Sequence, residues 1–418
     1  MKWLALDVGG ANLKAAHGDG RAWSMGFALW RQPQYLAAKL ADLTATAEPF
    51  DAVAVTMTAE LCDCYASKRE GVLHVLDAVR ALAAGRPVRV WTLDGSLVGV
   101  PEAEGNVLRC AASNWLALAV WLAGRFAVGR TLLIDCGSTT TDIVPLEDGR
   151  ARPRGLTDTN RLAEGELIYV GVRRTPLCAL GTSIMFQGRS TRVMAEQFAT
   201  TGDALLIRGE LPTEPDRHDT ADGRPWSREA AAARIVRMVG ADLEVVGAPA
   251  AQELADAFAD LVQQRVCEAI DQVCRVFRPA RVVLSGSGEF LAARAAGRSL
   301  PNVEQVRLEQ LIGGQASQAA CAYALAQLAT GPSSQVPANT TTYDRSSPGT
   351  QHICSTSEGD PSLQRSLTQV SNLNGAPPEL QDQDLIGVVN AWPTLSPAIK
   401  AGILAMIEAQ RGLKDSAP

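Results

Sequence analysis

The sequence predicts an α/β protein with two domains and a C-terminal tail, and three observations carry this prediction. The chain has 418 residues, 46% of them hydrophobic and 20% charged, which is enough for two globular cores. As far as residue 128, the hydrophobic pattern runs strand, strand, helix, strand, helix, strand, helix, which is typical of a mixed sheet with crossover helices. After Thr330 the composition changes abruptly to polar residues. We therefore expect one domain over residues 1–128 and a second over residues 129–330.

The tail has two parts that differ in composition. Residues 331–381 are rich in Ser, Thr, Pro, Gln and Asn and almost free of apolar residues, so we expect a disordered linker. Residues 382–413 regain apolar periodicity, with Asp384 placed to cap one helix and Pro393 to end it. We expect a small helical hairpin there, which docks on a protein partner or on the body of the chain.

Charge and cysteine content exclude several classes of protein. The net charge of −6 and a pI near 5.4, with no basic stretch, argue against a nucleic-acid-binding surface. The longest apolar region, residues 115–123, is too short to cross a bilayer, and Asp7 interrupts the first apolar residues before a signal peptide forms. The nine scattered cysteines then indicate reduced thiols. We expect a cytoplasmic protein that acts on small molecules and binds neither nucleic acid nor membranes.

The first motif is a strand that ends in an acid and a glycine turn. Residues 2–8 are expected to form this strand, Gly9-Gly10 the turn, and residues 13–16 a return strand. A carboxylate such as Asp7 at the end of a buried strand needs a metal or a turn N–H as partner. Lys14 is placed either to neutralise a phosphate or to lie in solvent.

Acids and bases crowd together after the next strand. Helical spacing over residues 33–46 leads into a strand at residues 52–57, and ligand sites of open α/β sheets collect at such strand ends. The segment that follows contains Glu60, Asp63, Lys68 and Arg69. Cys62-x-Cys64 is spaced too closely for a usual zinc site and has no second pair. The alternative is an ordinary helix start with charged residues in its first turn.

The second motif is the most informative stretch of the chain. It is preceded by a helix at residues 71–84, a strand at 90–93 and an apolar helix at 108–126. We expect Asn114 and Trp115 of the last helix to face a cleft between the two domains. Apolar residues then run into Asp135, a turn of small polar residues, and Asp142 before a return strand; the turn residues are Gly137, Ser138, Thr139 and Thr140. Free N–H groups in such a turn form an anion-binding concavity, and the acids can hold an accompanying divalent cation. An ordinary polar hairpin is the alternative.

The next third of the chain carries two weaker signals. Arg173 and Arg174 precede Pro176, which suits a bidentate contact with an anion or else a solvated turn. His218 lies among acids in a polar loop at residues 211–224, where a metal ligand and ordinary loop composition are both possible readings. The expected elements here are a helix at residues 192–198, a strand at 204–207, and helices at 227–238 and 250–277.

The third motif is a strand that runs into a glycine turn and then a helix. The strand begins at Arg281, Gly286 and Gly288 form the turn, and Glu289 starts the helix. This arrangement suits a nucleotide or another planar ligand that carries phosphate. A final helix is expected to begin near Gly313 and reach Leu328.

Together the three turns resemble the phosphate-1, phosphate-2 and adenosine motifs of the actin/hexokinase/Hsp70 superfold. The resemblance implies two actin-like (ribonuclease H-like) domains with a cleft between them. Two departures leave the use of ATP open. Ala11-Asn12 stands where a hydroxyl residue usually precedes the lysine, and Ser287 stands where glycine is usual.

Residues 1–330 are also similar to the hydantoinase/oxoprolinase-related proteins linked to tetrahydromethanopterin-dependent one-carbon transfer. The stretches that carry this similarity are residues 7–14, 56–64, 135–142 and 171–176. The group includes an enzyme of methanofuran biosynthesis that joins an aminomethyl-furanmethanol diphosphate to γ-glutamyltyramine through an ether bond and expels pyrophosphate. The resemblance therefore implies a transferase with a diphosphate leaving group.

We expect the following roles for the residues of the motifs, on the hypothesis that the phosphate-binding turns of the superfold hold a diphosphate leaving group. Mg²⁺ would be held by Asp7, Asp135 and Asp142, and the phenol proton would pass to Glu60 or Asp63. Phosphate oxygens would be bound by Gly9, Gly10, Asn12, Lys14, Gly137, Ser138, Thr139 and Thr140. Substrate would contact Lys68, Arg69, Gly286, Gly288 and Glu289, with Arg173 or Arg174 on the γ-glutamyl carboxylates. Two other readings stay open: an ATP-dependent kinase or amidohydrolase, and a non-catalytic nucleotide-binding scaffold whose tail recruits a partner.

Overall fold

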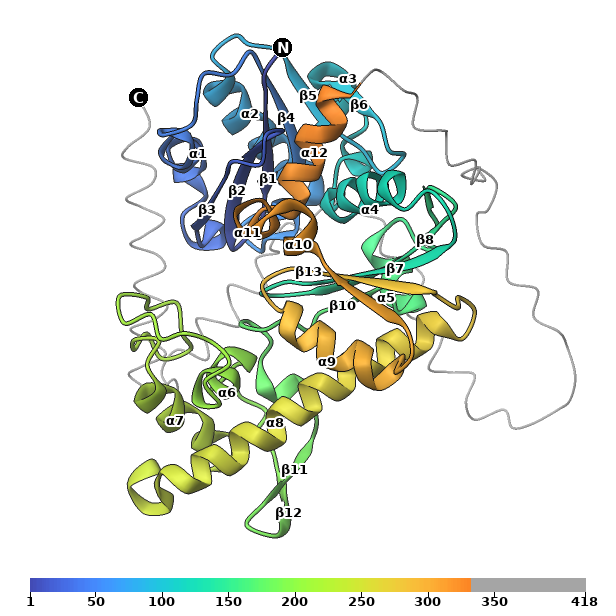
Figure 1. Ribbon diagram of the computed structural model, residues 1–418. Coiled ribbons are helices and arrows are strands. Elements are labelled where there is room, and N and C mark those ends of the chain that lie inside the picture. The colour runs from blue at the N-terminus through green and yellow to red at the C-terminus, as the bar shows by residue number, and fades with distance from the viewer. Residues whose placement is uncertain (332–418) are drawn as a thin grey trace, which may run out of the picture. The chain divides into compact units, whose positions relative to one another are not determined.

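The computed structural model describes residues 1–331, and the linker and helical hairpin expected beyond them lie outside the described residues. The described part is a mixed α/β structure with two six-stranded sheets, and this confirms the predicted fold class (Figure 1). Among residues 1–331, no helix is both long enough and apolar enough to cross a bilayer.

The first sheet has the strand order β3-β2-β1-β4-β5-β6. Its strands are β1 (Trp3–Val8), β2 (Asn12–His17), β3 (Ala22–Gly26), β4 (Ala52–Met57), β5 (Val88–Trp91) and β6 (Leu97–Gly99). Strand β1 pairs antiparallel with β2, so that Asp7 lies opposite Lys14, and parallel with β4, so that Asp7 lies beside Thr56. Parallel pairing brings the carboxyl ends of β1 and β4 to the same edge of the sheet. The segments that follow these strands therefore meet at one place.

Helices cover both faces of the first sheet because its strands alternate in the size of their side chains. Leu4 and Leu6 pack toward α1 and α2, whereas the small Ala5 lets helices approach closely on the other face. The first face is covered by α1 (Leu36–Thr44), α2 (Lys68–Ala83) and α3 (Val100–Gly105). The second is covered by α4 (Asn114–Arg125) and α12 (Ala320–Thr330), so the last described helix returns to the first sheet.

The second sheet has the order β10-β8-β7-β13-β14, with β9 paired to β8. Its strands are β7 (Arg130–Cys136), β8 (Thr141–Glu147), β9 (Arg150–Ala151), β10 (Leu167–Ile168), β13 (Arg281–Ser285) and β14 (Glu304–Arg307). The hairpin of β7 and β8 places Asp135 directly opposite Asp142, and the parallel strand β13 places Ser285 beside Asp135. The second predicted acid-turn-acid motif therefore lies at the carboxyl end of a central strand.

Helices on the second sheet bury one continuous core against it. The long helix α8 runs beneath this sheet beside α9 (Figure 1). The helices here are α5 (Asp158–Glu164), α6 (Thr201–Ile207), α7 (Arg228–Val236), α8 (Leu243–Cys274), α9 (Glu289–Ser299) and α10 (Leu308–Ile312). The next helix, α11 (Gly314–Gln318), lies against β3 of the first sheet. Short 3₁₀ helices complete the described chain: η1 (Leu29–Arg31), η2 (Pro33–Tyr35), η3 (Ala59–Leu61), η4 (Val107–Arg109), η5 (Leu177–Ala179) and η6 (Arg237–Val239).

Three predicted elements were wrong. Residues 192–198 are not a helix: a two-stranded hairpin of β11 (Ser183–Phe186) and β12 (Arg189–Arg192) ends there. Residues 204–207 are not a strand but the end of α6, because Thr200 and Asp203 form a capping box that starts a helix. The helix expected over residues 108–126 begins only at Asn114.

Candidate active site

Two hairpin turns, one from each sheet, face each other and form the centre of the site. The side chain of Asn12, after the first turn, donates a hydrogen bond to the hydroxyl of Ser138 in the second at 3.3 Å. The second turn is closed by the N–H of Gly137, which donates to the carbonyl of Thr140 at 2.8 Å. The two predicted phosphate motifs therefore come together in the folded chain.

Several carbonyl groups of the two turns already accept hydrogen bonds from the chain, whereas several of their N–H groups have no acceptor among residues 1–331. The carbonyls of Gly10 and Ala11 accept the N–H groups of Leu29 and Phe27, at 3.0 Å each. The carbonyl of Ser138 accepts the backbone N–H groups of both arginines of the 171–176 loop. Within residues 1–331, five turn N–H groups have no acceptor, those of Gly10, Ala11, Ser138, Thr139 and Thr140. Adjacent free N–H groups of this kind make an anion-binding concavity.

Carboxylates lie directly behind the two turns. Burial raises the pKa of Asp7, and Lys14, 4.0 Å from its carboxylate, acts in the opposite direction. Burial also raises the pKa of Asp135 and Asp142, and Asp142 is paired with Arg161 at 2.8 Å. Burial opposes the charge on Lys14, but the neighbouring acids outweigh it and raise the pKa of this lysine. Three carboxylates thus share two cations, which leaves one negative charge for an incoming cation or proton.

This donor set fits Mg²⁺ only together with a phosphate ligand. In residues 1–331, no group of three or more His, Cys, Asp or Glu side chains is arranged to hold a metal ion, and this includes the segment of Cys62 and Cys64 and the loop of His218. Mg²⁺ usually binds one or two carboxylates and takes its remaining oxygens from substrate phosphates and water. Asp7, Asp135 and Asp142 provide the carboxylates, and the adjacent turns provide a place for the phosphates.

Glu60 is the acid whose surroundings suit proton transfer. It lies in η3, just after β4, and is 1% exposed. Neither carboxylate oxygen has a hydrogen-bond partner among the described residues, and burial raises the pKa of Glu60 to about 7. Helix α2 holds it in place, since a Cβ on Gly71 would lie 2.5 Å from the Cα of Glu60. A carboxylate with a pKa near neutrality is suited to general base catalysis.

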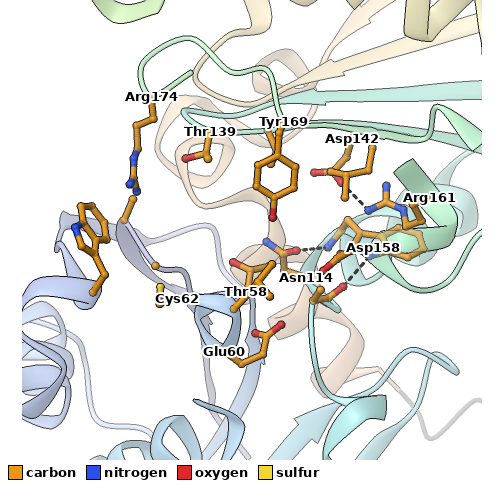
Figure 2. Close-up of a pocket in the computed structure, with 18 of the residues that line it drawn as sticks. Thr58, Glu60, Cys62, Asn114, Thr139, Asp142, Asp158, Arg161, Tyr169 and Arg174 are labelled. Atoms are coloured by element: carbon orange, nitrogen blue, oxygen red, sulfur yellow. Dashed lines mark hydrogen bonds and ion pairs between the residues drawn. The ribbon is translucent and has the colours of Figure 1, made fainter. Parts of the chain in front are cut away.

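The turns and Glu60 line the same pocket, which has a volume of about 410 Å³ (Figure 2). Figure 2 shows Arg174 and Arg161 reaching in from different sides, with Tyr169 between them and Glu60 below. The pocket is also lined by Trp30, Cys62, Asp63, Asn114, Trp115, Thr139, Thr140, Asp142 and Asp158. Asn114 also donates a hydrogen bond to Asp7 at 3.3 Å, which connects the pocket to the buried carboxylates.

Several residues predicted to contact substrate lie elsewhere. Arg173 is bonded to Glu214 and packs on Trp226, away from the pocket lining. Arg69 is exposed, and Lys68 forms an ion pair with Asp158 at 3.0 Å. Glu289 pairs with Arg307 at 3.5 Å.

The glycines of the third motif serve close packing of the chain against itself. Gly286 has a φ of +91°, and a Cβ there would lie 2.2 Å from the carbonyl oxygen of Cys136. A Cβ on Gly288 would lie 2.5 Å from the sulfur of Cys136 and from Val172. These contacts explain why glycine is needed at both positions without a ligand.

The sequence patterns did not point to Arg161, Asp158 or Trp30. Arg161 is 1% exposed, pairs with Asp142, and stacks with its Cζ 3.8 Å from the ring centre of Trp115. An arginine in a seven-residue helix has no feature in the sequence that separates it from a surface arginine. The one available signal was Thr157, which caps α5 and so fixes where that helix begins.

The fold and the site define an α/β protein whose two sheets each bring a hairpin turn with free N–H groups to one pocket, beside buried carboxylates. The chain belongs to the hydantoinase/oxoprolinase family, whose sequence profile matches residues 51–330, and the predicted family is thereby confirmed.

Two curated relatives carry the same name. The chain is similar to the (4-{4-[2-(gamma-L-glutamylamino)ethyl]phenoxymethyl}furan-2-yl)methanamine synthase of Methanocaldococcus jannaschii, with 33% identity over 328 residues, 78% of this chain and 96% of that one. It is 35% identical to the synthase of that name from Methanococcus vannielii over 158 residues, 38% of this chain and 71% of that one.

Among solved structures, the chain resembles a glucokinase of the ROK family from Streptomyces griseus, with a TM-score of 0.41 and 14% identity over 78% of this chain and 99% of that one. It also resembles an archaeal actin homolog, with a TM-score of 0.37 and 13% identity over 79% of this chain and 99% of that one.

Proposed function

We propose that this protein joins the phenol oxygen of γ-glutamyltyramine to the methylene carbon of an aminomethyl-furanmethanol diphosphate and releases pyrophosphate. The name of the two relatives describes the product of such a step, a phenoxymethyl ether on a furan that bears a methanamine group. One observation carries the proposal for this chain: an anion cradle and an unpaired carboxylate with a pKa near neutrality line one pocket.

The cradle would bind the diphosphate and stabilise it as it leaves. The free N–H groups of the two turns and the hydroxyls of Thr139 and Thr140 would donate to phosphate oxygens, with Lys14 behind them. Asp7 and Asp135 would hold Mg²⁺ against the same oxygens, beside Asp142 in its pair with Arg161, and the ion would neutralise the charge that grows on the leaving group.

The bond that breaks is the one between the furan methylene carbon and the diphosphate oxygen. As it breaks, positive charge develops on the carbon, where the furan ring delocalises it, and negative charge develops on the diphosphate. Donors fixed in advance around the developing negative charge are usually the largest contribution to catalysis. The free N–H groups of the two turns would supply these donors around the departing diphosphate.

The phenol oxygen forms the new bond to the same carbon, and its proton must leave. Glu60 would accept that proton, since it faces the pocket, lacks a hydrogen-bond partner among the described residues, and titrates near neutral pH. Asp63 also lines the pocket, but its side chain is exposed to solvent, whereas Glu60 is buried. Bond formation, bond cleavage and proton transfer then balance to the ether, pyrophosphate and one protonated carboxyl.

The reaction would take place in the cytoplasm. This expectation is supported by the eight cysteines of the described residues, all of which are free thiols.

The purified full chain tests the proposal directly when it is mixed with the furan diphosphate, γ-glutamyltyramine and Mg²⁺ in the absence of nucleotides. We expect equal amounts of ether and pyrophosphate. The Glu60→Gln variant, which keeps the cradle, should bind pyrophosphate as the wild type does but form ether at least 100-fold more slowly. A strict requirement for ATP with release of ADP would instead indicate a kinase or amidohydrolase. Nucleotide binding without any turnover would indicate a scaffold.

A further inference from the structure

Arg174 occupies a position in the pocket that the chemistry of the leaving group does not explain. Its backbone N–H donates to the carbonyl of Ser138 at 3.0 Å, so the second turn fixes where this residue begins. Its side chain reaches η1, the 3₁₀ helix that follows β3, where the Cζ lies 4.0 Å from the ring centre of Trp30. Figure 2 shows the guanidinium extending along the side of the pocket away from Asp142 and Arg161.

The charge of Arg174 lacks a counter-ion in the described part of the chain. Of the two arginines that line the pocket, Arg161 is paired with Asp142, whereas Arg174 forms no ion pair with any of residues 1–331. The neighbouring Cys62 does not supply a negative charge, because burial raises the pKa of its thiol to about 11. Burial also lowers the pKa of Arg174 itself, as expected for a cation removed from water without a partner.

The stack on Trp30 leaves one edge of the guanidinium available. The N–H donors of a guanidinium lie in its own plane, in the fork that matches a carboxylate, and the contact of its Cζ with the Trp30 ring uses none of them. Arg174 is therefore able to form a bidentate pair with a carboxylate, and no carboxylate of residues 1–331 is paired with it.

The adjacent arginine provides an internal contrast. Arg173 is one residue away and is also fixed by the carbonyl of Ser138, yet it pairs with Glu214 and packs against Trp226 with its Cζ 5.2 Å from the ring centre. Its charge is compensated within the protein. Of the two arginines, only Arg174 lines the pocket.

We propose that Arg174, held against Trp30, binds a carboxylate at the end of the phenolic acceptor and thereby sets the acceptor specificity of the enzyme. The inference rests on the proposed function and adds to it the residue that recognises the acceptor. The ligand chemistry is a phenol whose side chain ends in a carboxylate. The same phenol without the carboxylate should be a poor acceptor, because it leaves the guanidinium unpaired.

The test compares γ-glutamyltyramine with tyramine as acceptors for the wild type and for Arg174→Met. A hydrogen-bonded charge pair contributes roughly 1.5–3 kcal/mol, so we expect kcat/KM for γ-glutamyltyramine to fall about 10- to 100-fold in the variant. We expect kcat/KM for tyramine to change by less than about twofold on the same grounds, which removes the preference between acceptors. Arg174→Lys keeps the charge but not the fork and should lie in between.

Arg31→Met is the matched control. Arg31 follows Trp30 in η1, is exposed, and pairs with no acid among residues 1–331, so its replacement removes an equal charge from the residue next to the same tryptophan. We expect it to keep the wild-type preference. Inhibition by pyrophosphate should be unchanged in Arg174→Met, since the cradle is intact.

Two results would overturn the inference while leaving the proposed function standing. One is an equal loss of activity toward both acceptors in Arg174→Met and Arg174→Lys. The other is a rise in the inhibition constant of pyrophosphate with the acceptor preference unchanged, which would assign Arg174 to the leaving group. Calorimetric binding of γ-glutamyltyramine gives a readout without turnover: weaker binding to Arg174→Met than to wild type supports the inference, and equal binding rejects it. Failure of the wild type to form ether despite such binding would reject the proposed function alone.

Discussion

Replacing Glu60 by glutamine should make the folded protein more stable above neutral pH while it removes activity. Burial raises the pKa of Glu60 from its ordinary 4.5 to about 7. One pKa unit corresponds to about 1.4 kcal/mol, so ionised Glu60 costs the folded state on the order of 3 kcal/mol relative to the unfolded chain. Glutamine has a similar shape and carries no charge, so the variant does not incur this cost.

The sign follows from proton binding. Between pH 4.5 and about 7 the folded protein holds a proton on Glu60 that the unfolded chain has released. The free energy of unfolding of the wild type therefore falls as the pH rises through this window. Glutamine does not titrate, so position 60 of the variant contributes no such fall. The free energy of unfolding of Glu60→Gln minus that of wild type should rise by about 3 kcal/mol between pH 4 and pH 8. Any fixed effect of the amide cancels in this comparison.

Urea denaturation at a series of pH values measures the difference, with Glu309→Gln as the control because Glu309 is exposed. In parallel, kcat/KM of the wild type should rise with pH through about 7, as Glu60 becomes an ionised base, and the variant should lack this rise. A stability difference that stays constant from pH 4 to pH 9 would refute the buried, unpaired carboxyl. A variant that retains the wild-type pH profile would remove Glu60 from the mechanism.

Two further predictions concern the turns and the cation behind them. In Gly171→Ala the new Cβ would lie 2.5 Å from the backbone of Ser138 and Thr139, so the second turn must shift; calorimetry should show pyrophosphate binding weakened at least about tenfold. Gly124→Ala, which meets nothing within 4 Å in helix α4, should bind normally, and equal binding by both variants would contradict the role of the turn. Arg161→Met leaves the carboxylate of Asp142 without its partner and should cost about 3–5 kcal/mol in urea denaturation. Adding Asp142→Asn should restore much of that loss, and an additive loss would disprove the pairing.

The two hairpins were predictable because their signals are local. A buried strand, an acid and a glycine turn follow one another directly in the chain at Asp7 and Asp135, and the pairing of adjacent strands needs no distant partner. The position of Glu60 and Asp63 at the pocket was predictable for a similar reason, because they directly follow strand β4 and ligand sites of α/β sheets lie at strand ends. By contrast, the short apolar run at residues 204–207 has no periodicity that separates helix from strand, and the cap at Thr200 decided it.

The electrostatic partners in the site were not predictable from the sequence. Arg161 pairs with Asp142 from a separate helix, α5, and Trp30 contacts Arg174 from η1, far away in the sequence. Such contacts depend on how the two sheets come together. Neither the type nor the spacing of these residues carries that information. The burial of Glu60, which sets its pKa, likewise depends on the packing of α2 against η3.

The central claim is that the bond between the methylene carbon and the bridging oxygen breaks, so that this oxygen leaves with the diphosphate and the phenol oxygen becomes the ether oxygen. It is tested most directly with a furan diphosphate that carries oxygen-18 between the methylene carbon and phosphorus. Cleavage of the carbon–oxygen bond, as proposed, predicts that all of the label appears in pyrophosphate and none in the ether by mass spectrometry. Label retained in the ether product would show that the phosphorus–oxygen bond breaks instead, and would contradict the account.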